Sequence, residues 1–214
     1  MTLKSKLTRI YQEKIFRNAY FNTIKKELYN CDEVLDLGCG RNSAIQYCTI
    51  HFSVGVEIFE PDLEESKKKR LHNQYIKADI TKIEFKPESF DAVVALNVLE
   101  HLSIEEGVIL IEKMKKWTRK KIVISTPNGY VFQDEYDNNP QQKHKSGWSV
   151  EQLEKTGFKS VGCSGWKQLK GYKGTIKYKP RLFWIIISDM SQKIVYNFPK
   201  LAFEIIGIWK KNND

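Results

Sequence analysis

Short apolar runs alternate with charged stretches of helical spacing along most of this chain. Runs of this kind, separated by amphipathic segments, predict buried strands connected by helices. The expected strands cover residues 34–37, 51–58, 75–80, 90–102, 120–129, 158–166 and 201–211. The expected helices between them cover residues 44–48, 61–72, 103–117 and 149–156. The alternation predicts an α/β domain built on a mostly parallel sheet.

Two further stretches have helical spacing but lie outside this alternation. Residues 1–30 place apolar side chains among Lys, Arg and Glu, which predicts an N-terminal helical cap ahead of a domain over residues 31–214. Residues 167–199 form a hydrophobic insertion whose apolar side chains can share one helical face. Three interpretations stay open for it: packing on the core, a lid over a hydrophobic substrate pocket, and shallow membrane contact through residues 182–198.

The stretch VLDLGCGRNS carries the first chemical signal. Asp36 lies in an expected buried strand, and Gly38 and Gly40 follow where the strand turns. Glycines remove the side chains that would keep a small molecule off the backbone, and Gly38 can adopt the positive φ that such a turn needs. The dinucleotide fingerprint would place a third glycine where this chain has Ser43, which weakens that interpretation.

This turn resembles the first motif of class I S-adenosylmethionine-dependent methyltransferases, in which an acidic residue precedes a short Gly-x-Gly turn. The resemblance is to the small-molecule subset with a type 11 domain, and it covers about residues 30–160. It implies a Rossmann-like, seven-stranded sheet with helices on both faces and S-adenosyl-L-methionine as the cofactor. It also implies that the turn binds the amino-acid end of that cofactor through Asp36, Gly38, Cys39 and Gly40.

Later strand ends supply the other expected cofactor contacts. Glu57 follows the glycine turn at close to the roughly 20-residue spacing at which a carboxylate accepts hydrogen bonds from ribose hydroxyls, and Ile58 adjoins it. The resemblance implies that Asp79 binds the adenine amino group and that Ile80 packs on the ring. It also places Asn97 at the floor of the site.

Two histidines are the candidate catalytic residues. The tripeptide Leu99-Glu100-His101 closely resembles the same region of many small-molecule methyltransferases, and strand carboxyl ends of a parallel sheet face the ligand crevice. His144 lies in an irregular loop that can reach the same crevice. A base is useful only when the methyl acceptor arrives protonated, and histidine titrates near neutrality. Packing or loop-ordering roles are the alternatives.

Composition narrows the class of protein. The chain has 214 residues, with 41% hydrophobic and 29% charged, which suits one soluble domain with a real core. No apolar run reaches the roughly 18 residues of a membrane span and no secretory signal is recognisable, so a cytoplasmic location is expected. Four cysteines without a C-x-x-C pair predict neither a zinc site nor a disulfide framework, and no metal is expected. The net charge of +9 is concentrated at the two ends.

These features predict a methyltransferase that acts on an oxygen or nitrogen of a small molecule, lipid precursor or glycan intermediate. An RNA or DNA methyltransferase is one alternative, because the ends are basic. Against a nucleic acid partner, the sequence shows no recognisable nucleic-acid-binding module. A non-catalytic binding protein that retains the fold is the other alternative.

Overall fold

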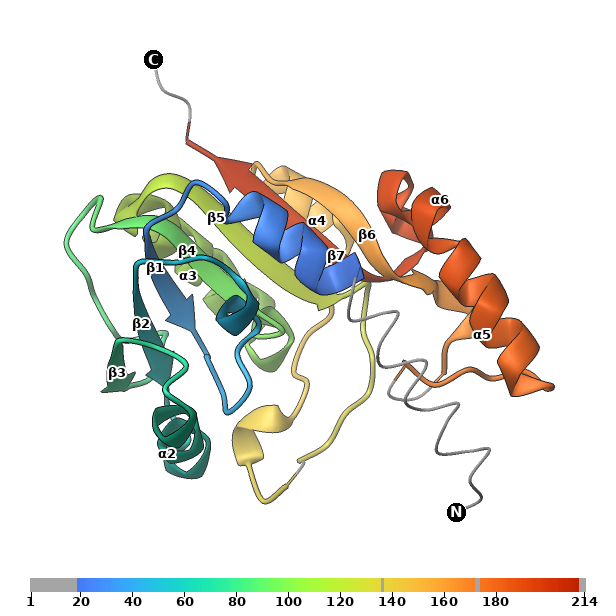
Figure 1. Ribbon diagram of the computed structural model, residues 1–214, viewed down its shortest axis with the longest axis horizontal. Helices are drawn as coiled ribbons and strands as arrows, with labels where there is room; N and C mark the ends of the chain where they lie inside the picture. Colours follow the sequence, from blue (N-terminus) through green and yellow to red (C-terminus); the bar gives the residue numbers. More distant parts are fainter. Residues whose placement is uncertain (1–18, 136, 172–173, 212–214) are drawn as a thin grey trace.

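A computed structural model describes residues 19–135, 137–171 and 174–211. Their centre is a seven-stranded sheet in the order β3-β2-β1-β4-β5-β7-β6 (Figure 1). The strands are β1 (Glu33–Leu37), β2 (Phe52–Glu57), β3 (Gln74–Lys77), β4 (Phe90–Leu96), β5 (Thr118–Pro127), β6 (Lys159–Trp166) and β7 (Ala202–Lys210). Strands β1 to β5 pair in parallel, whereas β7 runs antiparallel to both of its neighbours, β5 and β6. The predicted mostly parallel, seven-stranded α/β fold is confirmed.

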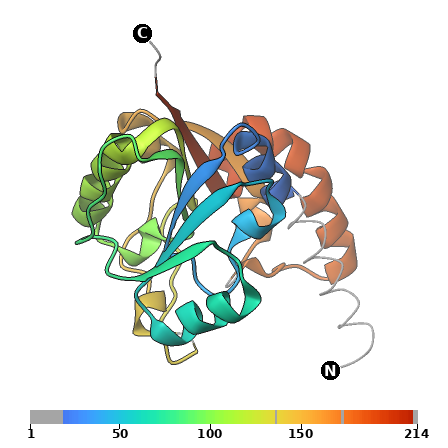
Figure 2. The ribbon, with the colours of Figure 1, turned by 60° about the vertical axis from the view of Figure 1, so that its left-hand side comes forward.

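Helices cover both faces of this sheet. They are a helix over residues 19–27, α2 (Glu60–Lys69), α3 (Ile104–Trp117), α4 (Val150–Lys155), α5 (Arg181–Met190) and α6 (Gln192–Asn197). Short 3-10 turns are η1 (Ala44–Tyr47), η2 (Leu99–His101), η3 (Pro140–Gln142), η4 (Lys167–Leu169) and η6 (Pro199–Leu201). Figure 2 shows α3 on one side of the sheet, with the 19–27 helix and α5 on the other.

Alternation along the buried strands divides the core into two layers. Leu35 and Leu37 of β1 join the side chains of α3 and α4 in one cluster, whereas Val34 joins Ile24 and Leu28 of the N-terminal helical segment in the other. Successive side chains of a strand point to opposite faces, so a central strand that is covered on both sides must be apolar throughout. This is why the core strands have the continuous apolar runs seen in the sequence.

Local capping signals fix two helix starts. Ser103 accepts a hydrogen bond from the backbone N–H of Glu106 and the Glu106 carboxylate accepts one from the Ser103 N–H, a complete capping box at α3. Ser149 and Gln152 form the same reciprocal pair at α4. Both helix starts were predicted from the sequence and are confirmed.

Three predicted element boundaries were wrong. Residues 44–48 form only the 3-10 turn η1, β3 ends at Lys77, and β4 ends at Leu96. Beyond Leu96 the chain leaves the sheet because Asn97 adopts a positive φ of 57° and η2 follows. The expected site residues Asp79 and Asn97 therefore lie on loops just past their strands, where they can face a ligand.

The insertion leaves about half of its described apolar side chains exposed. Ile185 and Val195 are buried, and Ile185 packs with Leu169 and Ile176. The exposed apolar side chains of α5, α6 and η6 are Leu182, Phe183, Ile186, Met190, Ile194, Phe198 and Leu201, called here the α5–α6 apolar surface. Within the described residues, no helix has the length and apolar character needed to cross a membrane. Residues 1–18 of the predicted N-terminal cap lie outside the described residues.

Candidate functional site

The glycine turn after β1 is shaped by two positive φ angles. Gly38 has φ of 66° and Gly40 has φ of 52°, conformations that glycine adopts without the strain of a side chain. A Cβ on Gly38 would lie 2.7 Å from Cγ2 of Val98, whereas a Cβ on Gly40 would meet no atom within 4 Å. Gly38 is therefore required by packing, and the backbone at Gly40 borders open space that a ligand can occupy.

Asp36 lies beneath this turn and does not line the cavity described below. Its carboxylate accepts a hydrogen bond from the hydroxyl of Ser43, and Nε2 of His72 lies 3.5 Å from its Oδ2. Burial raises the pKa of Asp36 to about 7, and burial lowers the pKa of His72 to about 4. The Asp36 carboxylate therefore binds a proton more readily than the His72 ring does. Through Ser43, Asp36 supports the turn from inside the fold.

Glu57 connects the end of β2 to the same turn. Its Oε2 accepts a hydrogen bond from the Gly40 N–H at 3.0 Å, and its Oε1 accepts one from the Phe59 N–H at 2.9 Å. Burial raises the pKa of Glu57, and the two backbone donors oppose that shift. Each carboxylate oxygen has a second lone pair, so Glu57 can still accept hydrogen bonds from a ligand.

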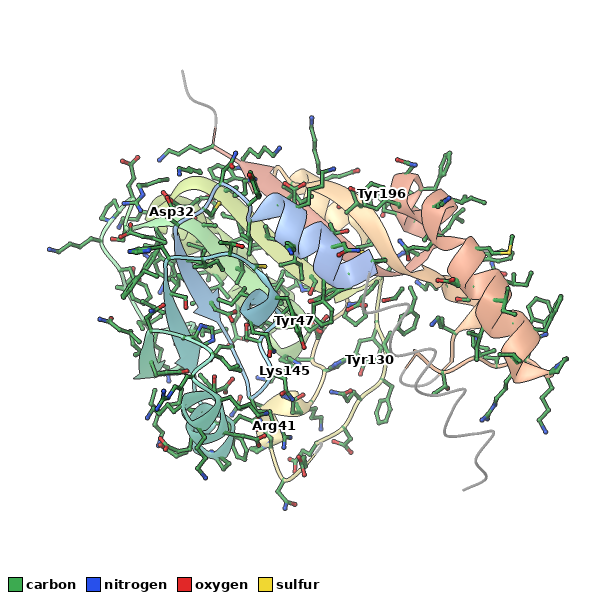
Figure 3. The ribbon with its side chains drawn as sticks, in the orientation of Figure 1. Asp32, Arg41, Tyr47, Tyr130, Lys145 and Tyr196 are labelled. Atoms are coloured by element: carbon green, nitrogen blue, oxygen red, sulfur yellow. The ribbon has the colours of Figure 1, made fainter. Side chains whose placement is uncertain are left out.

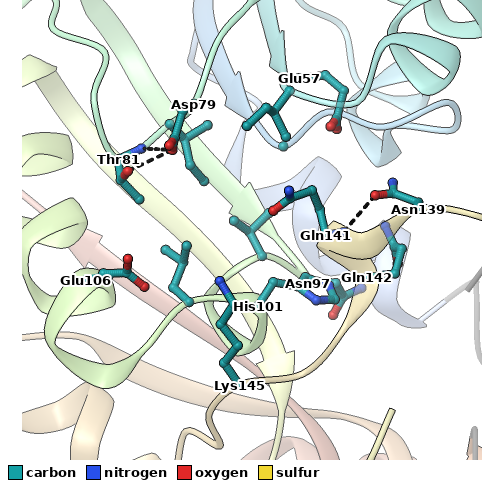
Figure 4. Close-up of a pocket in the computed structure, with 15 residues that line it drawn as sticks. Glu57, Asp79, Thr81, Asn97, His101, Glu106, Asn139, Gln141, Gln142 and Lys145 are labelled. Carbon is teal, nitrogen blue, oxygen red and sulfur yellow. Dashed lines mark hydrogen bonds between the residues drawn. The ribbon is translucent and has the colours of Figure 1, made fainter. Parts of the chain in front are cut away.

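A cavity of about 190 Å³ opens beside these residues, at the carboxyl ends of the parallel strands. In Figure 4, Glu57 and Asp79 lie on one side of it and Asn97, His101 and Lys145 on the other. Its lining residues are Gly38, Glu57, Ile58, Asp79, Ile80, Thr81, Asn97, Val98, His101, Leu102, Glu106, Asn139, Gln141, Gln142 and Lys145. Of the nine expected cofactor residues, Asp36, Cys39 and Gly40 are outside this lining, although Gly40 is bonded to Glu57.

The loop between β5 and α4 covers one side of this cavity. Arg41, labelled in Figure 3, lies between α2 and this loop and pairs with Asp62 at 3.2 Å and with Asp137. Asn139 is buried, and its Nδ2 donates to Oδ2 of Asp62 at 3.3 Å. Two polar contacts therefore attach the loop to α2 and hold η3 over the cavity.

A second cavity, of about 470 Å³, adjoins the first. Asn97, His101 and Gln142 line both cavities, so the two meet at these side chains. The other residues that line it are Glu100, Pro127, Val131, Gln133, His144, Phe203 and Glu204. The described residues thus form two adjacent compartments, one bordered by the glycine turn and one bordered by the two candidate histidines.

Asn97, at the junction, is fixed from β5. Its backbone N–H donates to the carbonyl oxygen of Ser125 at 2.9 Å, and the hydroxyl of Ser125 lies 3.4 Å from its Oδ1. The same Ser125 hydroxyl is 2.7 Å from the hydroxyl of Tyr20. Tyr20 therefore connects the 19–27 helix to the floor of the site, a contact that no motif in the sequence indicates.

The two histidines lie face to edge, with ring centroids 4.9 Å apart. Nδ1 of His101 is 3.2 Å from the carbonyl oxygen of Lys143, and Nδ1 of His144 is 2.6 Å from that of Val131. Burial is the main cause that lowers the pKa of both rings, to about 4 for His101. Both rings are therefore neutral near pH 7.

Glu100 contributes a fully buried carboxyl group next to these rings. Within the part of the chain that the structure describes, its Oε2 has no hydrogen-bond partner, and burial raises the pKa of Glu100 to about 8. Its backbone carbonyl accepts hydrogen bonds from the N–H groups of Lys145 and Ser146, which attach the loop after η3 to η2. Burial also raises the pKa of Glu204 on β7, which lines the same cavity.

Comparisons of the sequence with known proteins agree with this arrangement. Residues 35–124 match a family described as a methyltransferase domain. An uncharacterized protein of Methanocaldococcus jannaschii is 27% identical over 181 residues, which cover 83% of this chain and 72% of that protein. A sterol 24-C-methyltransferase of Clavispora lusitaniae is 29% identical over 161 residues, which cover 67% of this chain but only 41% of that enzyme.

Solved structures share the fold at low sequence identity. An S-adenosylmethionine-dependent methyltransferase of Archaeoglobus fulgidus superposes with a TM-score of 0.59 and 21% identity, over 94% of this chain and 98% of that one. A methyltransferase of the same cofactor class from Listeria monocytogenes gives a TM-score of 0.58 and 15% identity, over 94% of this chain and all of that one (100%).

The first cavity fits the cofactor of these proteins. Glu57 and Asp79 offer carboxylates to hydroxyl and amino groups, the apolar side chain of Ile80 offers a face to a planar base, and the space beside Gly40 is open. S-adenosyl-L-methionine has hydroxyl groups, an amino group and a planar base of this kind. The methyltransferase domain match over residues 35–124, the sheet order and the cavity agree, and the chain is similar in fold and cofactor cavity to S-adenosylmethionine-dependent methyltransferases.

Proposed function

We propose that this methyltransferase acts on an oxygen or nitrogen of a small molecule, lipid precursor or glycan intermediate that binds in the second cavity. The observation that carries the proposal is the junction of the two cavities at Asn97, His101 and Gln142. Methyl transfer needs a donor and an acceptor held close together and in line, and this proximity can supply several kcal/mol of the rate enhancement.

In the first cavity, each expected residue has a distinct proposed role. The sulfonium of the cofactor supplies an already activated methyl group. Glu57 accepts hydrogen bonds from the ribose hydroxyls, Asp79 accepts one from the adenine amino group, and Ile80 packs on the ring with Ile58 nearby. Asn97 forms the floor. The methionine end lies along the glycine turn, which comprises Gly38, Cys39 and Gly40 above Asp36.

In the second cavity, His101 and His144 are proposed to contact the acceptor. His144 is buried and both rings are held by backbone carbonyls, so their orientation is fixed before the acceptor binds. Pro127, Val131 and Phe203 add apolar side chains to the lining of the same cavity. A small acceptor with one polar reactive atom and an apolar body matches this lining.

A lipid-like acceptor is favoured by the α5–α6 apolar surface. Its seven exposed apolar side chains lie among basic residues, with Arg181, Lys193 and Lys200 exposed on the same segment. An amphipathic surface of this composition binds anionic lipid interfaces through apolar burial and charge attraction together. Peripheral contact with a membrane would bring a lipid precursor to the protein.

The test is methyl transfer to unfractionated acceptors. The protein is incubated with S-adenosylmethionine that carries a deuterated methyl group and, separately, with polar small molecules, lipids and nucleic acids extracted from cells. We expect labelled small molecules or lipids, and loss of label with Glu57→Ala but not with the control Glu64→Ala, a partly exposed position on α2 that lines neither cavity. Label in nucleic acid alone would support the RNA or DNA methyltransferase instead. A protein that binds the cofactor and labels nothing would be the non-catalytic alternative.

A further inference from the structure

Three groups that can bind a metal ion converge at the wall of the second cavity. Glu100, His101 and His144 each offer one ligand atom, and these atoms lie within 4.8 Å of one another. Ligand atoms that share one cation at about 2.1 Å lie at most about 4.2 Å apart, so a small side-chain movement closes the set. Glu100 and His101 come from η2, and His144 comes from the loop after η3, so two separate segments meet here.

The hydrogen bonds of the two rings leave Nε2 of each ring available to a ligand. A backbone carbonyl only accepts, so Nδ1 of His101 and Nδ1 of His144 each carry the proton that they donate to Lys143 and Val131. Nε2 of each neutral ring is then left with a lone pair. Histidines that bind metals commonly donate their other N–H to a backbone carbonyl in this way, which fixes the tautomer and the ring orientation.

Glu100 supplies an independent observation that points to a ligand. Its Oε2 is buried without a hydrogen-bond partner among the described residues. An unpartnered carboxylate oxygen in a protein interior is energetically unfavourable, so such an atom calls for an explanation. A cation bound between Oε2 and the two ring nitrogens would satisfy it.

We propose that Glu100, His101 and His144 bind a divalent first-row transition metal ion at the wall of the second cavity. Two imidazole nitrogens with one carboxylate suit Mn²⁺, Co²⁺ or Zn²⁺, whereas Mg²⁺ and Ca²⁺ prefer oxygen ligands throughout. No metal site is expected from the sequence, because the cysteines lack metal-binding spacing and His144 is 43 residues from His101. The structure brings these residues together.

The proposed cation narrows the chemical class of the methyl acceptor. Three protein ligands leave open coordination positions, and the second cavity borders them. An acceptor that carries a hydroxyl or carboxylate oxygen would occupy such a position and would be held next to the cavity of the methyl donor. This consequence rests on the proposed function, whereas the metal site itself does not.

Cobalt binding to the untagged protein tests the site directly. Titration with Co²⁺, followed by visible absorption and by calorimetry without cofactor, should show one bound ion per chain with a histidine-ligated spectrum. His144→Gln and Glu100→Gln should each weaken binding at least 10-fold, and the exposed control His51→Gln should leave it unchanged. Thermal unfolding of each variant confirms that it is folded, and the two variants change different segments, so misfolding of one leaves the other informative.

Two outcomes would overturn the proposal. One is a wild-type protein that binds S-adenosylhomocysteine but no Co²⁺, which leaves the methyltransferase assignment intact. The other is Co²⁺ binding that both variants retain at wild-type affinity, which places the ion elsewhere. Failure of the proposed function instead appears as loss of methyl transfer to every acceptor while the metal titration still gives one site.

Discussion

At the scale of single residues, Asp36 shows how the site is supported from inside the fold. The sequence presents it as a motif acid, and the structure places its carboxyl beneath the turn, bonded to Ser43. Burial raises its pKa to about 7. In this structure the motif acid therefore supports the backbone of the turn. A sequence pattern cannot distinguish that role from direct contact with a ligand.

This environment makes the stability of the protein depend on pH. An unfolded Asp ionises with a pKa near 3.9, so the folded protein retains a proton that the unfolded chain releases between about pH 4 and pH 7. The contribution of Asp36 to the free energy of unfolding therefore falls as the pH rises through that interval, by at most about 1.4 kcal/mol per pH unit.

The variant Asp36→Asn isolates this contribution, because His72 and Glu57 titrate in both proteins. Relative to the wild type, the variant should gain stability as the pH rises through this interval, and the gain should level off above about pH 7. Urea denaturation of both proteins at several pH values measures the difference. A difference that is constant with pH would show that Asp36 is ionised in the fold.

At the scale of elements, the loop that carries η3 closes the cofactor cavity through contacts with α2. Asn139 donates to Asp62 across 77 residues of sequence, and its Oδ1 accepts from the Gln141 N–H. Asn139→Ala removes both contacts, and each hydrogen bond contributes on the order of 1 kcal/mol. We expect dissociation of S-adenosylhomocysteine to be about 5- to 10-fold faster, because the loop opens more often.

Stopped-flow displacement measures this rate. The control is Glu135→Ala, an exposed position on the same loop whose side chain does not line either cavity. Equal dissociation rates for Asn139→Ala and the wild type would mean that the loop does not retain the ligand.

Elements were predictable where the signal is local. The capping boxes at Ser103 and Ser149 depend on residues three positions apart, and the continuous apolar runs mark strands covered on both faces. Contacts such as Asn139 with Asp62 and Tyr20 with Ser125 join distant segments, and a single sequence shows no period that links them. The positive φ of Asn97 likewise ended β4 earlier than the apolar run indicated.

For the candidate site, the residues expected from the sequence include seven of the fifteen that line the first cavity and three of the ten that line the second. Six expected cofactor residues line one cavity because parallel strand ends meet at one edge of the sheet. Glu204 and Phe203 were missed because β7 runs antiparallel and only the assembled sheet brings its start to this edge.

At the scale of the whole molecule, the α5–α6 apolar surface and the net charge of +9 predict binding to anionic membranes. Sedimentation with vesicles should show binding to a phosphatidylserine mixture and little binding to phosphatidylcholine alone. Phe183→Ser with Phe198→Ser should reduce the bound fraction at least about 10-fold, because each buried aromatic side chain contributes about 1.5–3 kcal/mol.

The matched control is Ile109→Ser, which removes an exposed apolar side chain from α3 on the other side of the sheet. An equal loss of vesicle binding in Ile109→Ser and in the double variant would contradict the assignment of the membrane contact to the α5–α6 apolar surface. Binding lost by the control alone would place the membrane contact on α3.

The most direct test of the account is calorimetry of S-adenosylhomocysteine and its 2′-deoxy analogue with the wild type, Glu57→Ala and the control Glu64→Ala. We predict that Glu57→Ala weakens binding of S-adenosylhomocysteine by about 1–3 kcal/mol, roughly 5- to 150-fold, and that Glu64→Ala does not. Removal of the 2′-hydroxyl should weaken binding to the wild type but not to Glu57→Ala, because the two groups interact with each other. Equal affinities of wild type and Glu57→Ala for S-adenosylhomocysteine would contradict the proposed site.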